Sequence, residues 1–170
     1  AALIRGVCAQ FSAMGLTEGG FAAVTDSRVA PGSGLSSSAA FEVLIANMVN
    51  GLFCGGEVDD GTLAFFGQCA ENAFFGKPSG LMDQLACSVG GVAALDFAKA
   101  DEPMVERVDY DFSGCGHALV LIDSGADHAD LTADYALIPQ EMCAIACEMG
   151  HELLSQCDPL EFYATAPILR

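Results

Sequence analysis

One stretch near the start of the chain places a Gly-rich turn and three serines directly before an apolar helical pattern. It reads VAPGSGLSSSAAFEVL, from Val29 to Leu44. Glycine permits backbone conformations and close approaches that other residues resist. The serines fall where the helix should begin, and a helix N-terminus favours an anion through its unpaired N–H groups and its dipole. Residue chemistry alone leaves two interpretations open, a capped helix and a phosphate site.

Charge and hydropathy exclude several classes of function. The net charge is −17, and only six residues are Lys or Arg. A nucleic-acid-binding protein needs a basic face, so that class is excluded. No apolar run approaches the roughly 18 residues of a membrane helix. Any bound phosphate would depend on backbone N–H groups, a helix end and a metal ion, because the stretch also lacks the lysine of the P-loop pattern.

The succession of helical and strand patterns predicts an α+β fold. Helices are expected over residues 1–15, from about 36 to 52, 59–75, 81–88 and 129–154. Strands are expected over residues 20–29, 91–97, 104–112 and 117–123. The second helix should bury Phe41, Leu44, Ile45, Met48 and Leu52, and the third Leu63, Phe66, Ala70, Ala73 and Phe74. Asp59 and Asp60 are suitable caps for the third helix.

Two acidic residues lie in apolar surroundings. Glu71 flanks the predicted buried stripe of the third helix, and Asp83 stands between Met82 and Gln84. Either could be an ordinary hydrogen-bonded carboxylate. A Glu, a Ser hydroxyl and an Asp around a phosphate would also suit metal-assisted phosphoryl transfer. Oxygen ligands would hold Mg²⁺, and the Asp would orient and deprotonate an attacking hydroxyl.

Three segments, in chain order, resemble motifs of one enzyme family. PGSGLSSSAAFEV (31–43) resembles the ATP-binding loop of the GHMP small-molecule kinases, in the version found in the galactokinase group. AENAFFGKPSGLMDQL (70–85) resembles the galactokinase segment with a metal-binding Glu and a catalytic Asp. ADLTADYALIPQEMC (129–143) is similar, more weakly, to the segment with a sugar-contacting Tyr.

The resemblance implies a fold and a reaction. The fold would be GHMP-kinase-like, with residues 1–115 forming part of the N-terminal ribosomal-S5-domain-2-like domain. Residues 116–170 would begin the C-terminal ferredoxin-like domain. The reaction would be ATP-dependent phosphorylation of the C1 hydroxyl of galactose to galactose 1-phosphate, with Mg²⁺, in the cytoplasm. The expected partners are the sugar and ATP, without nucleic acid or membrane.

The resemblance also implies site residues. The nucleotide phosphate loop would comprise Gly32, Ser33, Gly34, Leu35, Ser36, Ser37 and Ser38. Ser38 and Glu71 match the Mg²⁺ ligands. Asp83 matches the catalytic acid that faces the sugar, and Gly80 and Tyr135 match sugar contacts.

The chain also departs from the family pattern. The family's N-terminal sugar-binding motif with its catalytic Arg, and its C-terminal Gly-rich motif, are not found within the 170 residues. The segment around Tyr135 carries a Pro and lacks the family's usual basic residues. The isolated chain is therefore expected to be nearly inactive. Three alternatives stay open: a related kinase acting on N-acetylgalactosamine, galacturonate or arabinose, an inactive nucleotide-binding module, and a structural domain.

Overall fold

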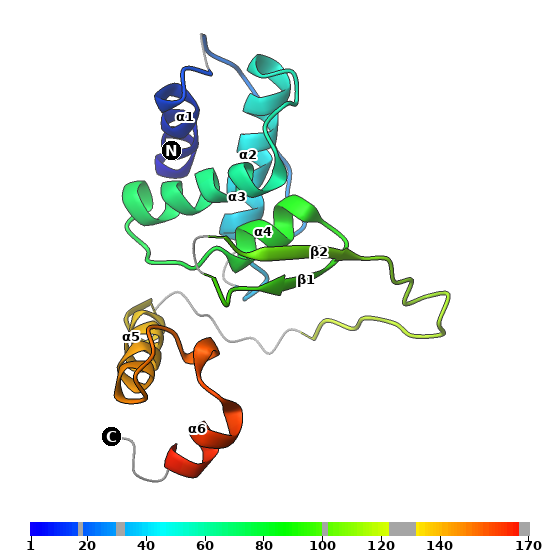
Figure 1. Cartoon of the computed structure of the whole chain (residues 1–170). Helices are drawn as coiled ribbons and strands as arrows, with labels where there is room; N and C mark the ends of the chain where they lie inside the picture. The colour runs from blue at the N-terminus through cyan, green and yellow to red at the C-terminus, as the bar shows by residue number, and fades with distance from the viewer. Residues whose placement is uncertain (17–18, 30–32, 100–101, 123–131, 167–170) are drawn as a thin grey trace. The chain divides into compact units, whose positions relative to one another are not determined.

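The chain folds into two compact units. The computed structural model describes residues 1–16, 19–29, 33–99, 102–122 and 132–166 (Figure 1). One unit takes in Ala1–Ala93 and Arg107–Ala129, the other Ala94–Glu106 and Asp130–Arg170. The domain boundary expected near residue 115 stays a prediction.

Helices dominate the described residues, and one two-stranded sheet accompanies them. The elements are α1 (Ala2–Ala13), α2 (Ser37–Phe53), α3 (Asp60–Cys69), the π-helical turn η1 (Ala70–Phe75), α4 (Met82–Val89), β1 (Val92–Asp96), β2 (Met104–Val108), α5 (Thr132–Glu148), the 3₁₀ turn η3 (Leu154–Gln156) and α6 (Pro159–Thr165). β1 pairs with β2. This mixture agrees with the α+β prediction.

Most predicted helices are present, with shifted ends. α3 begins as expected, because the Asp59 carboxylate accepts a hydrogen bond from the Thr62 N–H at 3.0 Å. α2 continues to Phe53, so Gly51 lies inside it. α5 continues through Pro139 without ending there. The first part of that predicted helix, residues 129–131, lies outside the described residues.

Two of the predicted strands are absent. Residues 20–29 and 117–122 have extended or irregular backbone without strand pairing among the described residues. Residue 123, the last of the predicted strand over 117–123, lies outside the described residues. Their side chains are largely exposed, with Val24 98% exposed and Ile122 87% exposed. An alternating pattern becomes a strand only when a neighbouring strand accepts its hydrogen bonds. The predictions over 91–97 and 104–112 were confirmed as the shorter strands β1 and β2, because these two pair with each other.

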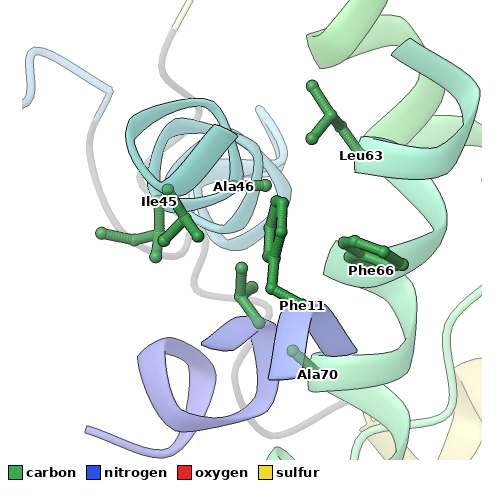
Figure 2. Close-up of a cluster of buried hydrophobic side chains, with 8 residues drawn as sticks. Phe11, Ile45, Ala46, Leu63, Phe66 and Ala70 are labelled. Carbon is green, nitrogen blue, oxygen red and sulfur yellow. The ribbon is translucent and has the colours of Figure 1, made fainter. Parts of the chain in front are cut away.

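The core of the first unit lies where α1, α2 and α3 meet (Figure 2). Phe11 of α1 projects between the other two helices, and its ring packs edge-on against Phe66 with centroids 4.7 Å apart. Ile45 and Ala46 of α2 and Leu63 of α3 complete the contact. All five side chains are almost fully buried. This cluster holds together the helices that carry the candidate site.

The predicted apolar faces are only partly correct. On α2, Ile45 is buried, but Leu44 and Leu52 are exposed. The buried face of α2 instead includes the polar residues Glu42 and Asn50. In the third predicted helix the buried stripe stops after Ala70, which leaves Ala73 and Phe74 exposed. The π-helical turn explains this, because its wider i→i+5 bonding shifts later residues away from the face of an α-helix.

α1 approaches η1 too closely for any side chain at Gly6. A Cβ atom at Gly6 would lie 2.6 Å from the Ala70 Cβ and 2.7 Å from the Ala70 Cα. Both positions belong to well-packed helical backbone, which cannot move aside easily. Gly6 therefore sets the distance between α1 and the segment that carries Glu71.

Gly6→Ala should lower the free energy of unfolding by about 1–3 kcal/mol, because overpacking forces the backbone segments apart. Gly51→Ala is the matched control. It lies inside α2 with nothing within 4 Å of a Cβ atom. It should stabilise the chain by about 0.5–1 kcal/mol. Urea unfolding followed by circular dichroism measures both, and equal effects of the two substitutions would contradict the close-approach explanation.

Candidate functional site

Ser38 and Glu71 meet at the centre of the candidate site. The Ser38 hydroxyl, in the first turn of α2, donates a hydrogen bond to Glu71 Oε1 at 2.9 Å. The two residues are 33 positions apart in the sequence. Glu71 lies in η1 and is only 2% exposed. π-helical turns occur often at functional sites, and this one carries the carboxylate at the interface with α2.

Further donors surround the Glu71 carboxylate. Lys77 Nζ lies 3.0 Å from Oε1, and Gln84 Nε2 of α4 donates to Oε2 at 3.0 Å. Burial alone would raise the pKa of Glu71. Hydrogen bonds from Ser79, Lys77 and Ser38 outweigh that effect and hold the pKa below its ordinary value. Glu71 is therefore a buried carboxylate that stays ionised at neutral pH.

Glu42 is a second buried acid, one turn after Ser38 on α2. Gln84 Nε2 donates to Glu42 Oε2 at 3.0 Å, so one amide nitrogen bonds two carboxyl groups. Burial raises the pKa of Glu42 to about 7, and the hydrogen bond from Gln84 opposes part of that rise. Glu42 and Gln84 are both 0% exposed. The two glutamates thus differ in ionisation although they share one hydrogen-bond donor.

The loop before α2 contains two residues with positive φ angles. Gly34 has φ 72° and Ser36 has φ 56°, a left-handed conformation that is uncommon for a residue with a side chain. Ser36 occupies the N-cap position of α2, yet its side chain makes no capping hydrogen bond. This finding disfavours the interpretation of the serines as a plain helix cap. Ser33, Gly34 and Leu35 are exposed, and Gly32 lies outside the described residues.

Asp83 and Gly80 lie on the segment that leads into α4. Asp83 is in the first turn of α4 and half-buried, and it is close enough to Glu42 to help raise that residue's pKa. Gly80 is exposed. The preceding Ser79 is fixed by Asn72 Oδ1, which accepts from the Ser79 N–H at 2.7 Å. Gln68 Nε2 donates to the Ser79 carbonyl at 3.1 Å. α3 and η1 thus hold the approach to Asp83 in place.

Tyr135 belongs to α5 in the second unit and is 52% exposed. The other predicted site residues that the structure describes lie in the first unit. The expected role of Tyr135 as a sugar contact stays a prediction.

Ser38 and Glu71 suit a magnesium ion chemically. Both offer hard oxygen atoms, and Mg²⁺ is usually bound by one or two carboxylates together with water and substrate phosphates. The described residues contain no cluster of three or more His, Cys, Asp or Glu side chains around a metal-sized space. A site of this kind does not need one. Lys77 and Ser38 both bond Glu71 Oε1. A bound cation would therefore have to displace the Lys77 ammonium group or share this oxygen with it.

Sequence reasoning missed six residues of this site: Glu42, Gln68, Asn72, Lys77, Ser79 and Gln84. Glu42 had a detectable signal, because it is the one charged residue of α2. Gln84 had a weaker signal as the neighbour of Asp83. The roles of Asn72 and Lys77 depend on how the loop after η1 folds back, which periodicity does not reveal.

Comparison with known proteins agrees with the motifs. The family described as "GHMP kinases N terminal domain" matches residues 2–91, more than half of the chain. The chain belongs to the GHMP kinases. The matched span of this GHMP kinase includes the Ser38–Glu71 contact and Asp83, and it ends just before β1.

Similar proteins carry the name galactokinase. That of Clostridium tetani is 41% identical over 86 residues, which are 51% of this chain and 22% of that protein. That of Streptomyces coelicolor is 34% identical over 131 residues, which are 75% of this chain and 32% of that protein. That of Mycobacterium tuberculosis is 35% identical over 132 residues, 78% of this chain and 36% of that protein. This chain thus spans only about a third, or less, of the length of these relatives.

Hydropathy adds one finding. Within the part of the chain that the structure describes, no helix has both the length and the apolar character needed to span a bilayer.

The raised pKa of Glu42 makes stability depend on pH. The folded state binds this proton more tightly than the unfolded state, so the resulting stabilisation is complete below about pH 4.5 and lost as pH rises through about 7. The loss should be on the order of 3 kcal/mol. Glu71, with its lowered pKa, acts in the opposite sense and only at lower pH.

Urea unfolding between pH 4.5 and 8 measures this dependence. Glu42→Gln has no proton to lose, so the difference in stability between it and the native chain should change across this window. A constant difference would show that Glu42 titrates normally in the folded chain.

Proposed function

We propose that this chain is the part of a galactokinase that binds ATP phosphates and Mg²⁺ and carries the catalytic carboxylate. The reaction is transfer of the ATP γ-phosphoryl group to the C1 hydroxyl of galactose. The observation that supports it most is the 2.9 Å contact between Ser38 and Glu71. Folding brings together the two residues that the family resemblance assigns to the metal. The expected cytoplasmic location stays a prediction.

The loop from Gly32 to Ser38 would receive the ATP phosphates. The chain has few cations, so backbone N–H groups at the start of α2 would supply most of the attraction. The left-handed backbone at Ser36 and Gly34 turns the loop sharply before the helix. The Ser36 side chain makes no cap to α2, so it does not compete for those N–H groups through that contact.

Ser38 and Glu71 would hold Mg²⁺ through the hydroxyl and the ionised carboxylate. When bound, this ion would neutralise negative charge on the transferring phosphoryl group. Gln84 fixes the far oxygen of Glu71, so the carboxylate presents its Oε1 edge toward Ser38. The Lys77 ammonium group supplies positive charge beside Glu71 Oε1.

Asp83 would accept or orient the sugar hydroxyl proton. It lies in the first turn of α4, directly before Gln84, so the residue that fixes Glu71 also anchors the backbone at Asp83. General base catalysis requires that the carboxylate be placed within hydrogen-bond reach of the hydroxyl. The Asn72 and Gln68 bonds to Ser79 fix the loop that leads to this position.

The sugar identity is a separate part of the proposal. The relatives named galactokinase favour galactose over the substrates of the related N-acetylgalactosamine, galacturonate and arabinose kinases. An inactive nucleotide-binding module is disfavoured because Glu71 and Asp83 are both present. Parallel assays with the four sugars would discriminate among these kinases.

Ser38→Ala should weaken Mg²⁺-ATP binding by the chain about 10-fold or more, because it removes a metal ligand and one hydrogen bond to Glu71. Isothermal titration calorimetry with and without Mg²⁺ measures this loss. Ser88→Ala is the matched control, since Ser88 lies on α4 and its hydroxyl donates a long 3.5 Å hydrogen bond to Asp60 Oδ1. Equal affinities for the native chain and Ser38→Ala would refute the assignment of Ser38.

Asp83→Asn should lower kcat by about 10²–10⁴-fold while leaving Mg²⁺-ATP affinity unchanged, because the carboxylate acts on the hydroxyl proton. Turnover is best measured in a chimera in which residues 2–91 replace the matching segment of Clostridium tetani galactokinase. Galactose-dependent ADP release is the assay, and the exposed Asp60→Asn substitution is the control. An unchanged kcat for Asp83→Asn would remove Asp83 from the chemistry.

A further inference from the structure

Glu42 and Gln84 form a fully buried pair with an unusual hydrogen-bond count. Gln84 Nε2 donates to Glu42 Oε2 at 3.0 Å. The remaining oxygen of each side chain, Glu42 Oε1 and Gln84 Oε1, is buried and has no hydrogen-bond partner among the residues that the structure describes. A buried acceptor without a donor destabilises the folded state. Here two such acceptors belong to two groups that are already bonded to each other.

We propose that Glu42 carries a proton on Oε1 and donates it to Gln84 Oε1, which closes a two-bond acid–amide pair. A carboxylic acid offers one O–H donor and one carbonyl acceptor, and a primary amide offers the complementary N–H and C=O. One proton therefore satisfies both unpartnered oxygens. The ionised form of Glu42 offers no donor and would leave the Gln84 oxygen facing a carboxylate.

The surroundings of Glu42 favour the neutral acid. The backbone of α3 packs tightly against the pair at Gly67, where a Cβ atom would lie 3.2 Å from both Gln84 Cγ and Glu42 Cβ. Some charged neighbours raise the pKa of Glu42 and others lower it. Glu71 and Asp83 oppose ionisation of Glu42, and Lys77 favours it. The thiol of Cys87 also lies within range of the Glu42 charge. Burial is the largest influence and raises the pKa of Glu42 to about 7.

The pair makes Gln84 a positioning residue for Glu71. Closing the pair fixes the amide plane of Gln84, so its second N–H can point only at Glu71 Oε2, 3.0 Å away. Reversing the amide would set its oxygen against the ionised Glu71. Glu42 thereby acts on Glu71 through Gln84. The role of Glu71 toward the metal rests on the proposed function, whereas the acid–amide pair does not.

Carbon-13 NMR of the chain labelled at glutamate side-chain carboxyl carbons tests the pair. At pH 5.5 ordinary glutamates are ionised, because their pKa is about 4.3. The Glu42 carboxyl, assigned by its loss in Glu42→Gln, should show the chemical shift of a neutral acid. In Gln84→Met its shift should move, because the amide partner is gone. A Glu42 signal at the carboxylate position at pH 5.5 would overturn the pair, whatever the enzyme does.

Mg²⁺-ATP affinity tests the positioning role. In Glu42→Gln the new amide offers the same donor and acceptor to Gln84, so affinity should stay within about 2-fold of the native chain. Glu42→Leu opens the pair and should weaken affinity about 10–100-fold, as loss of a ligand-orienting partner does. Gln84→Met, which is similar in size to Gln, should weaken it equally and covers the case in which Glu42→Leu fails to fold by circular dichroism.

The outcomes separate the two proposals. Native-like affinity in Gln84→Met, or a loss in Glu42→Gln as large as in Glu42→Leu, would overturn the positioning role. If the native chain shows no Mg²⁺-ATP binding, the proposed function and the positioning role both fail, while the NMR measurement still decides whether Glu42 is the neutral acid.

Discussion

The candidate site depends on one carboxylate that has been removed from water and kept charged. Glu71 is almost fully buried, yet its pKa is lowered, because hydrogen bonds from Ser79, Lys77 and Ser38 outweigh the effect of burial. Donors from three separate parts of the chain replace the hydration of its two oxygens. Ser38 comes from the start of α2, Lys77 from the loop after η1, and Gln84 from α4. The charge can be buried only when all three segments are in place. Folding of the first unit and assembly of the site are therefore the same event.

The apolar core positions the helices that carry the site, although none of its residues belongs to the site. Phe11 packs against Phe66 on α3, one turn before η1 begins, and Gly6 lets α1 approach Ala70 directly beside Glu71. The positions of α2 and α3 relative to each other thus determine whether the Ser38 hydroxyl reaches Glu71. A change in core packing would therefore alter the hydrogen bond between Ser38 and Glu71.

Sequence reasoning predicted the parts of this structure that depend on local rules. The cap at Asp59, the helix after the serines and the strands β1 and β2 follow from residue preferences within a few positions. It also predicted that Ser38 and Glu71 belong to one site, through family motifs. It failed where distant segments decide the outcome. Apolar and polar residues alternate over 20–29 and 117–122 as in strands, but in the described part of the chain no neighbouring strand pairs with these segments. Glu42 is buried against the side-chain amide of Gln84, which lies 42 positions away in the sequence.

The π-helical turn has a consequence for how the family can vary in length. A π-turn corresponds to an α-helix with one residue inserted, and here that extra residue lies at Ala70–Phe75. Deleting one residue between Asp60 and Ala70 would rotate Glu71 by about 100° around the helix axis and turn it away from α2. The turn between α2 and α3, around Gly55 and Gly56, carries no such constraint, because it bears none of the site residues. Natural variation in length should therefore be concentrated in the turn between Phe53 and Asp59 and be rare between Asp60 and Gln84.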